Sequence, residues 1–393
     1  WYVIFCLGMF QTNFLQDGQS YLVADYDPLS LTIGVLTFKN RKPHIEHCVR
    51  SFFGPDERTF HPRVFERNFL QSCQELEKKS WKLPTDVCVF LDSGKSIATS
   101  TGYTFSREEE DAPITLEEIN EYATNLREQS SHQAQKIWTE ESGYSDKERK
   151  LISIFLSYFA LDKKYHVFPL GKKASHITMR CLFFYGEQTL LDGISRSIRS
   201  AGYNLLTCVP LPLLFLNHIC NQKTFLKNHL HIHLWYDSTT VVLHLGKHIQ
   251  EIQIIPFGWQ LLDDALSLHF SPLERESFLM GSEYHIIAQR PEVIQYTSFL
   301  SASLRVLFER FWLQWSFTDY SVSSVWPAQI IHTIVKAGEL SPWIQKNSSH
   351  ERFGIDPTRH WLQYCDTLDP LFSLHPHPLL ALVRSVFIPP HAE

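Results

Sequence analysis

The chain has 393 residues, with 36 Lys and Arg against 42 Asp and Glu, a net charge of -6, and 44% apolar residues. These values are typical of a globular protein and exclude a disordered or fibrous chain. A nucleic-acid-binding protein is not expected either, because the sequence has no basic run. Only 16 of the 393 residues are glycine, whereas glycine usually makes up about 7% of a soluble protein. Glycine-rich phosphate loops are therefore not expected.

Cysteine usage and hydropathy indicate a cytoplasmic protein. Eight cysteines are scattered without a C-x-x-C pair, which is typical of buried, reduced thiols. No segment reaches the ~18–20 apolar residues of a membrane span. We therefore expect attachment to the inner face of the cell membrane only through partners.

The first segment predicts a strand pair, a third strand and a covering helix. Two β-rich runs, Tyr21–Asp25 and Leu31–Phe38, flank the turn dipeptide Asp27-Pro28, and His44–Phe53 follows. Pro62 then opens a helix whose apolar face comprises Phe65, Phe69, Cys73 and Leu76. Strands covered by a helix indicate a layered α/β domain.

Residues 85–180 form a distinct block of strands and helices. Thr115 with Glu118, and Ser145 with Glu148, have the capping-box spacing that predicts a helix start. The expected elements are a hairpin of Val87–Leu91 with Ser96–Phe105, helices from Thr115 to about Trp138 and from Ser145 through Leu161, and strands Tyr165–Phe168 and His176–Phe184.

The remaining chain returns to an α/β pattern. The expected elements are a helix through Leu191, Ile194 and Ile198 that ends at Gly202, a strand Leu205–Val209, a hairpin of His229–Leu234 with Thr240–Leu245, a strand Ile249–Pro256, a helix Leu261–Leu268 and a helix over roughly 292–316. The strand–turn–strand unit near 21–38 recurs near 229–246, each time followed by a strand and a helix. This recurrence indicates a duplicated fold.

The duplication, with a small block inserted into its first half, resembles the actin/Hsp70-like ATPase fold, a duplicated ribonuclease H-like α/β architecture. The inserted block resembles the small α+β domain of the FtsA group of bacterial cell-division proteins and of the related pilus protein PilM. Local matches to the family's "I-T-x-E-D", "L-D-G", "P-L-G", "I-P-I-G-G" and "A-Q" motifs occur in that order at Pro113–Ile119, Ala160–Asp162, Pro169–Gly171, Ile255–Gly258 and Ala328–Gln329.

The resemblance implies four parts of the chain. They are residues 1–84 as the first part of actin-like domain I, 85–180 as the inserted FtsA-type domain, 181–226 as the second part of domain I, and 227–393 as domain II, in which 282–318 is a reduced helical subdomain.

In this fold an Asp at each of two hairpin loops holds the metal or its waters, and neighbouring glycines let backbone amides reach the phosphates. By the resemblance, Asp25 stands at the first Asp position, but Asp27 replaces the loop glycine and Thr32 the family's Lys. A carboxylate at Asp27 would repel a triphosphate by about 3–4 kcal/mol at an effective dielectric of 20.

The second loop departs from the family pattern as well. Its Asp position aligns with His233 and its glycine position with Trp235. A shifted register would restore Asp237 as the metal ligand, but it would put Thr239 at the glycine position. Neither register yields a phosphate loop.

Bulky residues also replace glycines at two later turns. Gly258 is kept but Trp259 follows it, and the adenosine turn holds Val325, Trp326 and His332. Three Trp side chains at such positions could fill the cleft, because each can cover about 150–250 Å². We therefore expect that ATP and Mg²⁺ binding are lost and that no catalytic residue remains.

These expectations favour a non-catalytic pseudo-ATPase that acts as a scaffold in bacterial cell division. Its partners would be proteins, either FtsZ-like or membrane proteins of the division or pilus machinery, and it could self-associate. Two alternatives are a PilM-like scaffold of type IV pilus or secretion assembly and a genuine actin-like ATPase with divergent loops. A zinc enzyme built on His229, His231 and His233, which share one strand face, is a further but weaker alternative.

Overall fold

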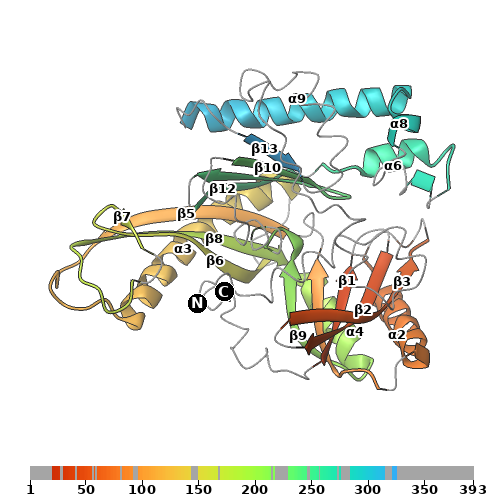
Figure 1. Ribbon diagram of the computed structural model, residues 1–393, viewed down its shortest axis with the longest axis horizontal. Helices are drawn as coiled ribbons and strands as arrows, with labels where there is room; N and C mark the ends of the chain where they lie inside the picture. Colours follow the sequence, from red (N-terminus) through yellow and green to blue (C-terminus); the bar gives the residue numbers. More distant parts are fainter. Residues whose placement is uncertain are drawn as a thin grey trace. The chain divides into compact units, whose positions relative to one another are not determined.

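The computed structural model describes residues 20–26, 30–39, 42–54, 57, 60–79, 82–91, 96–142, 149–166, 169–213, 216, 229–245, 248–255, 257–271, 274–275, 284–314 and 321–324 (Figure 1). The chain forms two compact units. The first comprises Trp1–Gln222, His248–Gln253 and Leu382–Glu393, and the second comprises Lys223–Lys247 and Ile254–Ala381. Within the described ranges, no helix is long and apolar enough to cross a membrane.

A five-stranded mixed sheet forms the base of the first unit, in the order β3-β2-β1-β4-β9. Its strands are β1 (Ser20–Tyr26), β2 (Ser30–Lys39), β3 (Lys42–Phe52), β4 (Asp86–Leu91) and β9 (Asn204–Pro210). β1 pairs antiparallel with β2 and parallel with β4. The predicted strand pair around Asp27-Pro28 is therefore confirmed, and β4 lies between β1 and β9.

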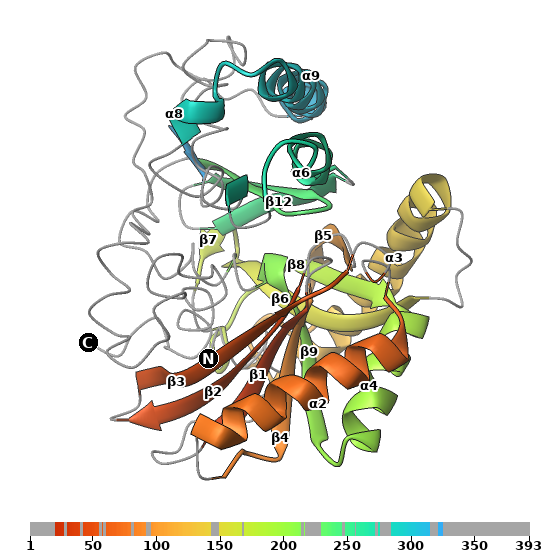
Figure 2. The ribbon, with the colours of Figure 1, turned by 90° about the vertical axis from the view of Figure 1, so that its right-hand side faces the viewer.

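Two helices, α2 (Pro62–Lys79) and α4 (Gln188–Ser200), cover one face of this sheet (Figure 2). The side of α2 that was predicted to be apolar is buried, as is Ile194 of α4. On the sheet, alternate residues such as Leu22 and Ala24 complete this core, because successive strand side chains point to opposite faces.

The inserted block is a four-stranded antiparallel sheet with a long helix on one face. The order is β5-β8-β6-β7, with β5 (Ser96–Ser106), β6 (Arg149–Leu161), β7 (Lys164–Tyr165) and β8 (His176–Glu187). Helix α3 (Leu116–Ser142) packs mainly against β5 and also contacts β8. Its core contains Leu126 and Ala134 of α3 and residues such as Phe159, Met179 and Phe183 of the sheet.

Two predictions for this block are wrong. Ser96–Phe105 is not the hairpin partner of β4, because β4 pairs with β1 and β9 while β5 pairs with β8. The predicted helix through Leu161 is the strand β6, and residues 143–148, where it was expected to begin, lie outside the described ranges. β6 is rich in Ile, Leu, Phe and Tyr, a composition that suits strands as well as apolar helices.

The turn between β6 and β7 supports the local match to the "L-D-G" motif. Asp162 and Lys163 have φ values of 47° and 67°, a left-handed region that glycine adopts most easily. The Asp162 carboxylate accepts hydrogen bonds from the amides of Ser175 and His176 at 3.1 and 2.8 Å. Lys163 therefore adopts, as a non-glycine residue, the backbone conformation expected of the motif's glycine.

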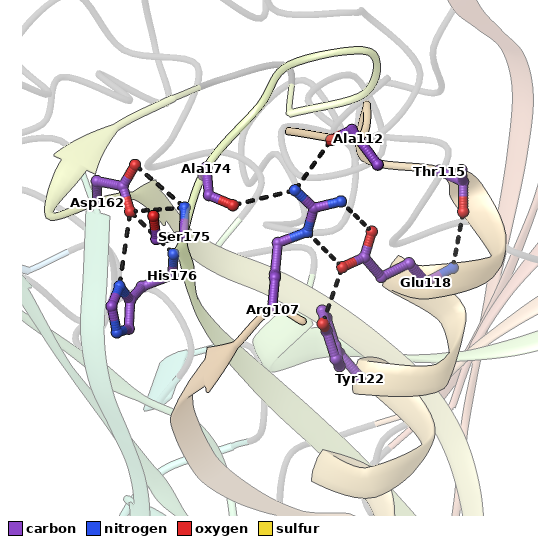
Figure 3. A network of polar contacts seen from close by, with 9 residues as sticks. All are labelled: Arg107, Ala112, Thr115, Glu118, Tyr122, Asp162, Ala174, Ser175 and His176. Atoms are coloured by element: carbon purple, nitrogen blue, oxygen red, sulfur yellow. Dashed lines mark hydrogen bonds and ion pairs between the residues drawn. The ribbon is translucent and has the colours of Figure 1, made fainter. Parts of the chain in front are cut away.

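A buried guanidinium joins α3 to the sheet of the inserted block (Figure 3). Arg107 donates to both carboxylate oxygens of Glu118 at 2.6 and 3.1 Å, and to the carbonyl oxygens of Ala112 and Ala174, both at 3.0 Å. The Tyr122 hydroxyl donates to the same carboxylate at 2.9 Å. Thr115 caps the helix, because its Oγ1 accepts from the Glu118 amide, but the Glu118 side chain of the predicted capping box is turned to Arg107.

The second unit contains the predicted second hairpin. β10 (His229–Leu234) pairs antiparallel with β11 (Thr239–Leu245) and parallel with β13 (Ser321–Ser324), in the sheet order β12-β11-β10-β13. β12 is His248–Ile255, of which His248–Gln253 is grouped with the first unit. The helices of the second unit are α6 (Gln260–Leu266), α8 (Tyr284–Ile287) and α9 (Pro291–Gln314). Helix α9 packs against α6, and its buried residues include the predicted Leu300 and Leu304.

The Arg107–Glu118 pair should make the inserted block sensitive to acid. Partial burial alone raises the pKa of Glu118, but the hydrogen bonds from Arg107 and Tyr122 outweigh it and hold the pKa below the usual value. A carboxylate with a lowered folded-state pKa stabilises the fold above its unfolded pKa of about 4.3. This stabilisation is lost as the pH falls through the lower folded-state value.

We expect Glu118→Gln to lower the free energy of unfolding by about 2 kcal/mol at pH 7, because a charged hydrogen-bond acceptor is removed from a buried guanidinium. The difference from wild type should shrink below about pH 4. Urea unfolding across this pH range measures both effects. Glu117→Gln, at the exposed neighbouring position, is the control and should change stability by less than about 0.5 kcal/mol. Equal losses in the two variants would contradict the role given to Glu118.

Candidate nucleotide-site residues

The first hairpin holds Asp25 and Thr32 opposite each other. They are register partners in β1 and β2, and Asp25 also lies beside Phe90 of β4. Asp25 is 1% exposed and Thr32 is fully buried. Thr32 Oγ1 makes no hydrogen bond within the described part of the chain. The carboxylate at the first Asp position is thus covered by protein, while Asp27 lies outside the described residues.

The residue after Asp25 helps to fix this strand end. Tyr26 points to the opposite face, where its ring contacts those of Phe53, Phe60 and Phe65 at centroid distances of 5.8, 5.5 and 5.7 Å. Aromatic pairs in tilted or edge-to-face geometry at such distances contribute beyond their buried area. The aromatic residue that begins the loop is therefore part of the α2 side of the core.

In the second hairpin, the residues at the Asp and glycine positions contact each other. His233 is fully buried, and its ring centroid lies 3.6 Å from that of Trp235, which is 6% exposed. The Trp235 indole donates a hydrogen bond to Thr240 Oγ1 at 2.7 Å, and Thr240 is the register partner of His233. The indole N–H, the polar group of this bulky side chain, is therefore used inside the hairpin.

The turn between β10 and β11 is closed by the segment that opens α6. The Trp259 amide donates to the Trp235 carbonyl at 3.0 Å, and the Gln260 amide donates to the Tyr236 carbonyl at 2.8 Å. Within the turn itself, the Trp235 amide donates to the Ser238 carbonyl at 2.8 Å. Amides at a helix start can bind a phosphate when they are free. Here three amides of the two motif segments donate to carbonyl oxygens of the turn.

Gly258 is required by this close approach. A Cβ atom at this position would lie 2.5 Å from the Ser238 amide nitrogen and even closer to the carbonyl oxygens of Trp235 and Tyr236. The Gly258 carbonyl accepts a hydrogen bond from the Tyr296 hydroxyl of α9 at 3.0 Å, and the rings of Tyr236 and Trp259 meet edge to face at 4.8 Å. Gly258, the one glycine that this turn shares with the family motif, thus allows the segment before α6 to contact the backbone of the turn between β10 and β11.

The sequence-predicted residues fall into separate groups. His233, Trp235, Gly258 and Trp259 belong to one packed cluster in the second unit, and Asp25 and Thr32 share a strand end in the first. Trp326 and the side chains of His229 and His231 lie outside the described residues. No cluster of three or more metal-ligating side chains occurs within the described ranges.

Sequence reasoning missed the residues that complete the second cluster. Thr240 and Tyr236 were treated as strand and turn positions, yet they bind Trp235 and Trp259. The available signal was the composition of the turn itself, Trp235-Tyr236-Asp237-Ser238. Large aromatic side chains in a turn must be covered by other residues.

We expect Gly258→Ala to lower the free energy of unfolding of the second unit by at least about 2 kcal/mol, because backbone atoms must move to admit the methyl group. Thermal unfolding followed by near-UV circular dichroism, which reports the packed Trp and Tyr rings, measures the loss. Gly54→Ala is the matched control, since a Cβ there meets only Glu57 side-chain atoms at 3.8–3.9 Å. Similar melting temperatures for the two variants would show that the turn can yield at Gly258.

Comparison with known proteins identifies the fold through structure alone. No protein-family profile matches the sequence, and no curated protein does. The structure of a PilM–PilN type IV pilus biogenesis complex matches 94% of this chain and 99% of its own chain, with a TM-score of 0.54 and 14% identity.

More distant matches include a Bacteroides thetaiotaomicron protein with an actin-like ATPase fold, at 7% identity and a TM-score of 0.40, over 86% of this chain and 96% of its own. The ethanolamine utilization protein EutJ from Carboxydothermus hydrogenoformans matches at 8% identity and a TM-score of 0.41, over 95% and 92% of the two chains. The chain has the actin-like ATPase fold that its sequence predicted.

Proposed function

We propose that this protein is a non-catalytic scaffold with an actin-like fold that acts in type IV pilus or secretion assembly. The observation that carries the proposal is the match to the PilM–PilN structure over nearly the whole of both chains. PilM in that structure stands in a complex with another protein. A protein-binding role does not depend on nucleotide chemistry, and the fold that it would use is present in this chain.

The condition of the motif residues supports the non-catalytic part of the proposal. A metal-holding carboxylate must reach the ion, yet Asp25 is covered by protein. Amides that could meet phosphate oxygens at Trp235, Trp259 and Gln260 donate to carbonyl oxygens of the chain. ATP and Mg²⁺ would have to displace these bonds before binding.

Buried thiols support a cytoplasmic location. Cys73 and Cys88 are free and buried. Burial raises the pKa of Cys73 and of Cys88 to about 12, so neither forms a thiolate near neutral pH. Buried, unpaired cysteines are typical of proteins in a reducing compartment.

The cell-division role predicted from the sequence stays a second proposal. Its support is the local resemblance to the FtsA group, including the left-handed conformations of Lys163 and Gly171 at the "L-D-G" and "P-L-G" matches. An FtsZ-like partner has no support beyond that resemblance. The pilus or secretion role is preferred because it rests on a match along the whole chain.

Nucleotide addition tests the non-catalytic part. Ligand at about a hundred times its Kd stabilises a protein by about 2.7 kcal/mol, which raises the melting temperature by several degrees. We expect millimolar Mg-ATP to shift the melting temperature by less than about 1 °C, with Mg-ADP and EDTA as controls. The Asp25→Asn variant distinguishes the alternatives: a Mg-ATP shift in wild type that disappears in this variant would establish a working metal site and overturn the proposal.

Deletion of the gene in its native host tests the cellular role. We expect loss of assembled pili or of the secreted substrate, with cells of normal length, because septation would not depend on this scaffold. Electron microscopy of the cell surface and measurement of cell length give the two readouts. Filamentous cells with intact pili would favour the cell-division role instead, and complementation with the wild-type gene controls for effects on neighbouring genes.

A further inference from the structure

The inserted block has a long edge strand whose outer side takes no partner strand within the described residues. β5 pairs with β8 at all 11 positions, from Ser96 opposite Gly186 to Ser106 opposite His176, without a register shift. The amides and carbonyls on the other side of such a strand form a regular template for one more strand.

Edge strands usually carry features that prevent pairing, such as charges, prolines, bulges or short length. The other described edges have them. β3 contains Lys42, Pro43 and Arg50 and has a register shift against β2, and β9 has a register shift and Pro210. β12 contains Glu251, while β7 and β13 have two and four residues. β5 has no charged residue, no proline and no register shift.

The accessible part of this edge is its second half. Gly102, Thr104 and Ser106 are exposed, and Tyr103 is 54% exposed. On the α3 side, the Tyr103 and Phe105 ring centroids lie 5.0 Å apart, and the Phe105 ring stacks on Tyr122 of α3 at 4.1 Å. A strand added here would lay alternate side chains beside these rings.

Charge indicates which segment would pair with this edge. Glu108, Glu109, Glu110 and Asp111 follow β5 and are all exposed, and Glu117 and Glu121 are exposed on the first turns of α3. Arg107, between β5 and this run, is bound to Glu118, and Lys173 pairs with Asp111 at 3.8 Å, so the run keeps a net negative charge. Lys or Arg in an added segment would therefore be favoured beside this end of the strand.

The position of α3 disfavours a second copy of the chain as the occupant. Because α3 packs mainly against β5, two-fold antiparallel pairing of β5 strands would place a second α3 helix on the same face of the joined sheet, and the second β5 would bring no Lys or Arg to the acidic residues. A single extended segment brings no such helix.

We propose that β5 is a docking edge for an extended segment of a partner protein that has apolar or hydroxyl side chains at alternate positions and Lys or Arg next to Glu108–Asp111. The segment pairs with the backbone of residues 102–106 and extends the sheet of the inserted block. This inference rests on the proposed scaffold function and names the surface and the chemistry through which the scaffold would bind.

Fluorescence anisotropy with a defined probe tests the docking edge. The probe is the labelled peptide acetyl-Lys-Arg-Thr-Val-Thr-Tyr-Thr-Val-amide, with one version that has Glu in place of Lys and Arg and one with alternate amides N-methylated. We expect saturable binding of the first peptide to the full chain. The Glu version should bind about ten-fold more weakly, a difference of about 1.4 kcal/mol, and the N-methylated version should not bind, because it cannot complete the backbone pairing.

Two matched variants locate the binding. Thr104→Lys puts a charge on the exposed edge and should weaken binding of the first peptide at least about ten-fold. Thr124→Lys, at an exposed position of α3, should change it less than about two-fold, although it adds the same charge. No binding to wild type, equal effects of the two variants, or undiminished binding of the N-methylated peptide would each overturn the proposal.

Two outcomes separate this inference from others. A wild-type dimer in sedimentation analysis that Thr104→Lys dissociates would make a second copy the occupant and overturn the partner-segment proposal. Peptide binding by a protein that also binds Mg-ATP would contradict the non-catalytic proposal while upholding the docking edge. Absence of both peptide and nucleotide binding would leave the scaffold function in place and refute only the edge.

Discussion

A buried amide, indole or guanidinium N–H needs an acceptor, and this requirement organises both units of the chain. At the turn between β10 and β11, the acceptors are carbonyl oxygens of the turn and Thr240 Oγ1. Each bond needs two segments in close contact, and Gly258 makes that contact sterically possible. The hydrogen bonds that a phosphate group would otherwise take are thereby part of the folded protein. The proposed loss of nucleotide binding and the internal stability of this turn would have one physical cause.

The same requirement explains the inserted block. A guanidinium as buried as that of Arg107 is costly unless its donors are satisfied. It contacts the first turn of α3 through Glu118, and the loops that precede α3 and β8 through the Ala112 and Ala174 carbonyls. These contacts tie the start of α3 to the end of β5, the strand against which the helix mainly packs. The Arg107–Glu118 ion pair therefore fixes where α3 starts relative to β5, in addition to stabilising the inserted block.

The sequence correctly predicted those features that depend on residues close together in the chain. The strand–turn–strand units near 21–38 and 229–246, the apolar face of α2 and the helix around Leu300 and Leu304 follow from periodicity and turn residues, and all are present. The predictions from sequence were wrong where contacts with residues far away in the chain determine the structure. β6 is a strand because β8 lies beside it, and the Glu118 side chain binds Arg107, eleven residues away, in preference to its own helix start.

The candidate site was also predictable only in part, because its residues belong to local motifs but its hydrogen bonds join separate segments. Motif comparison found Trp235, Gly258 and Trp259, but the bonds that join them cross from the hairpin to α6 and could not be read from either segment. The inserted block shows a complementary limit. A run such as Ser96–Ser106 reads as an ordinary strand in the sequence, and only its place at the edge of a sheet makes its lack of charge informative. A charged residue costs little at such an edge and prevents unwanted pairing, so the uncharged edge of β5 is best explained by pairing that serves a function.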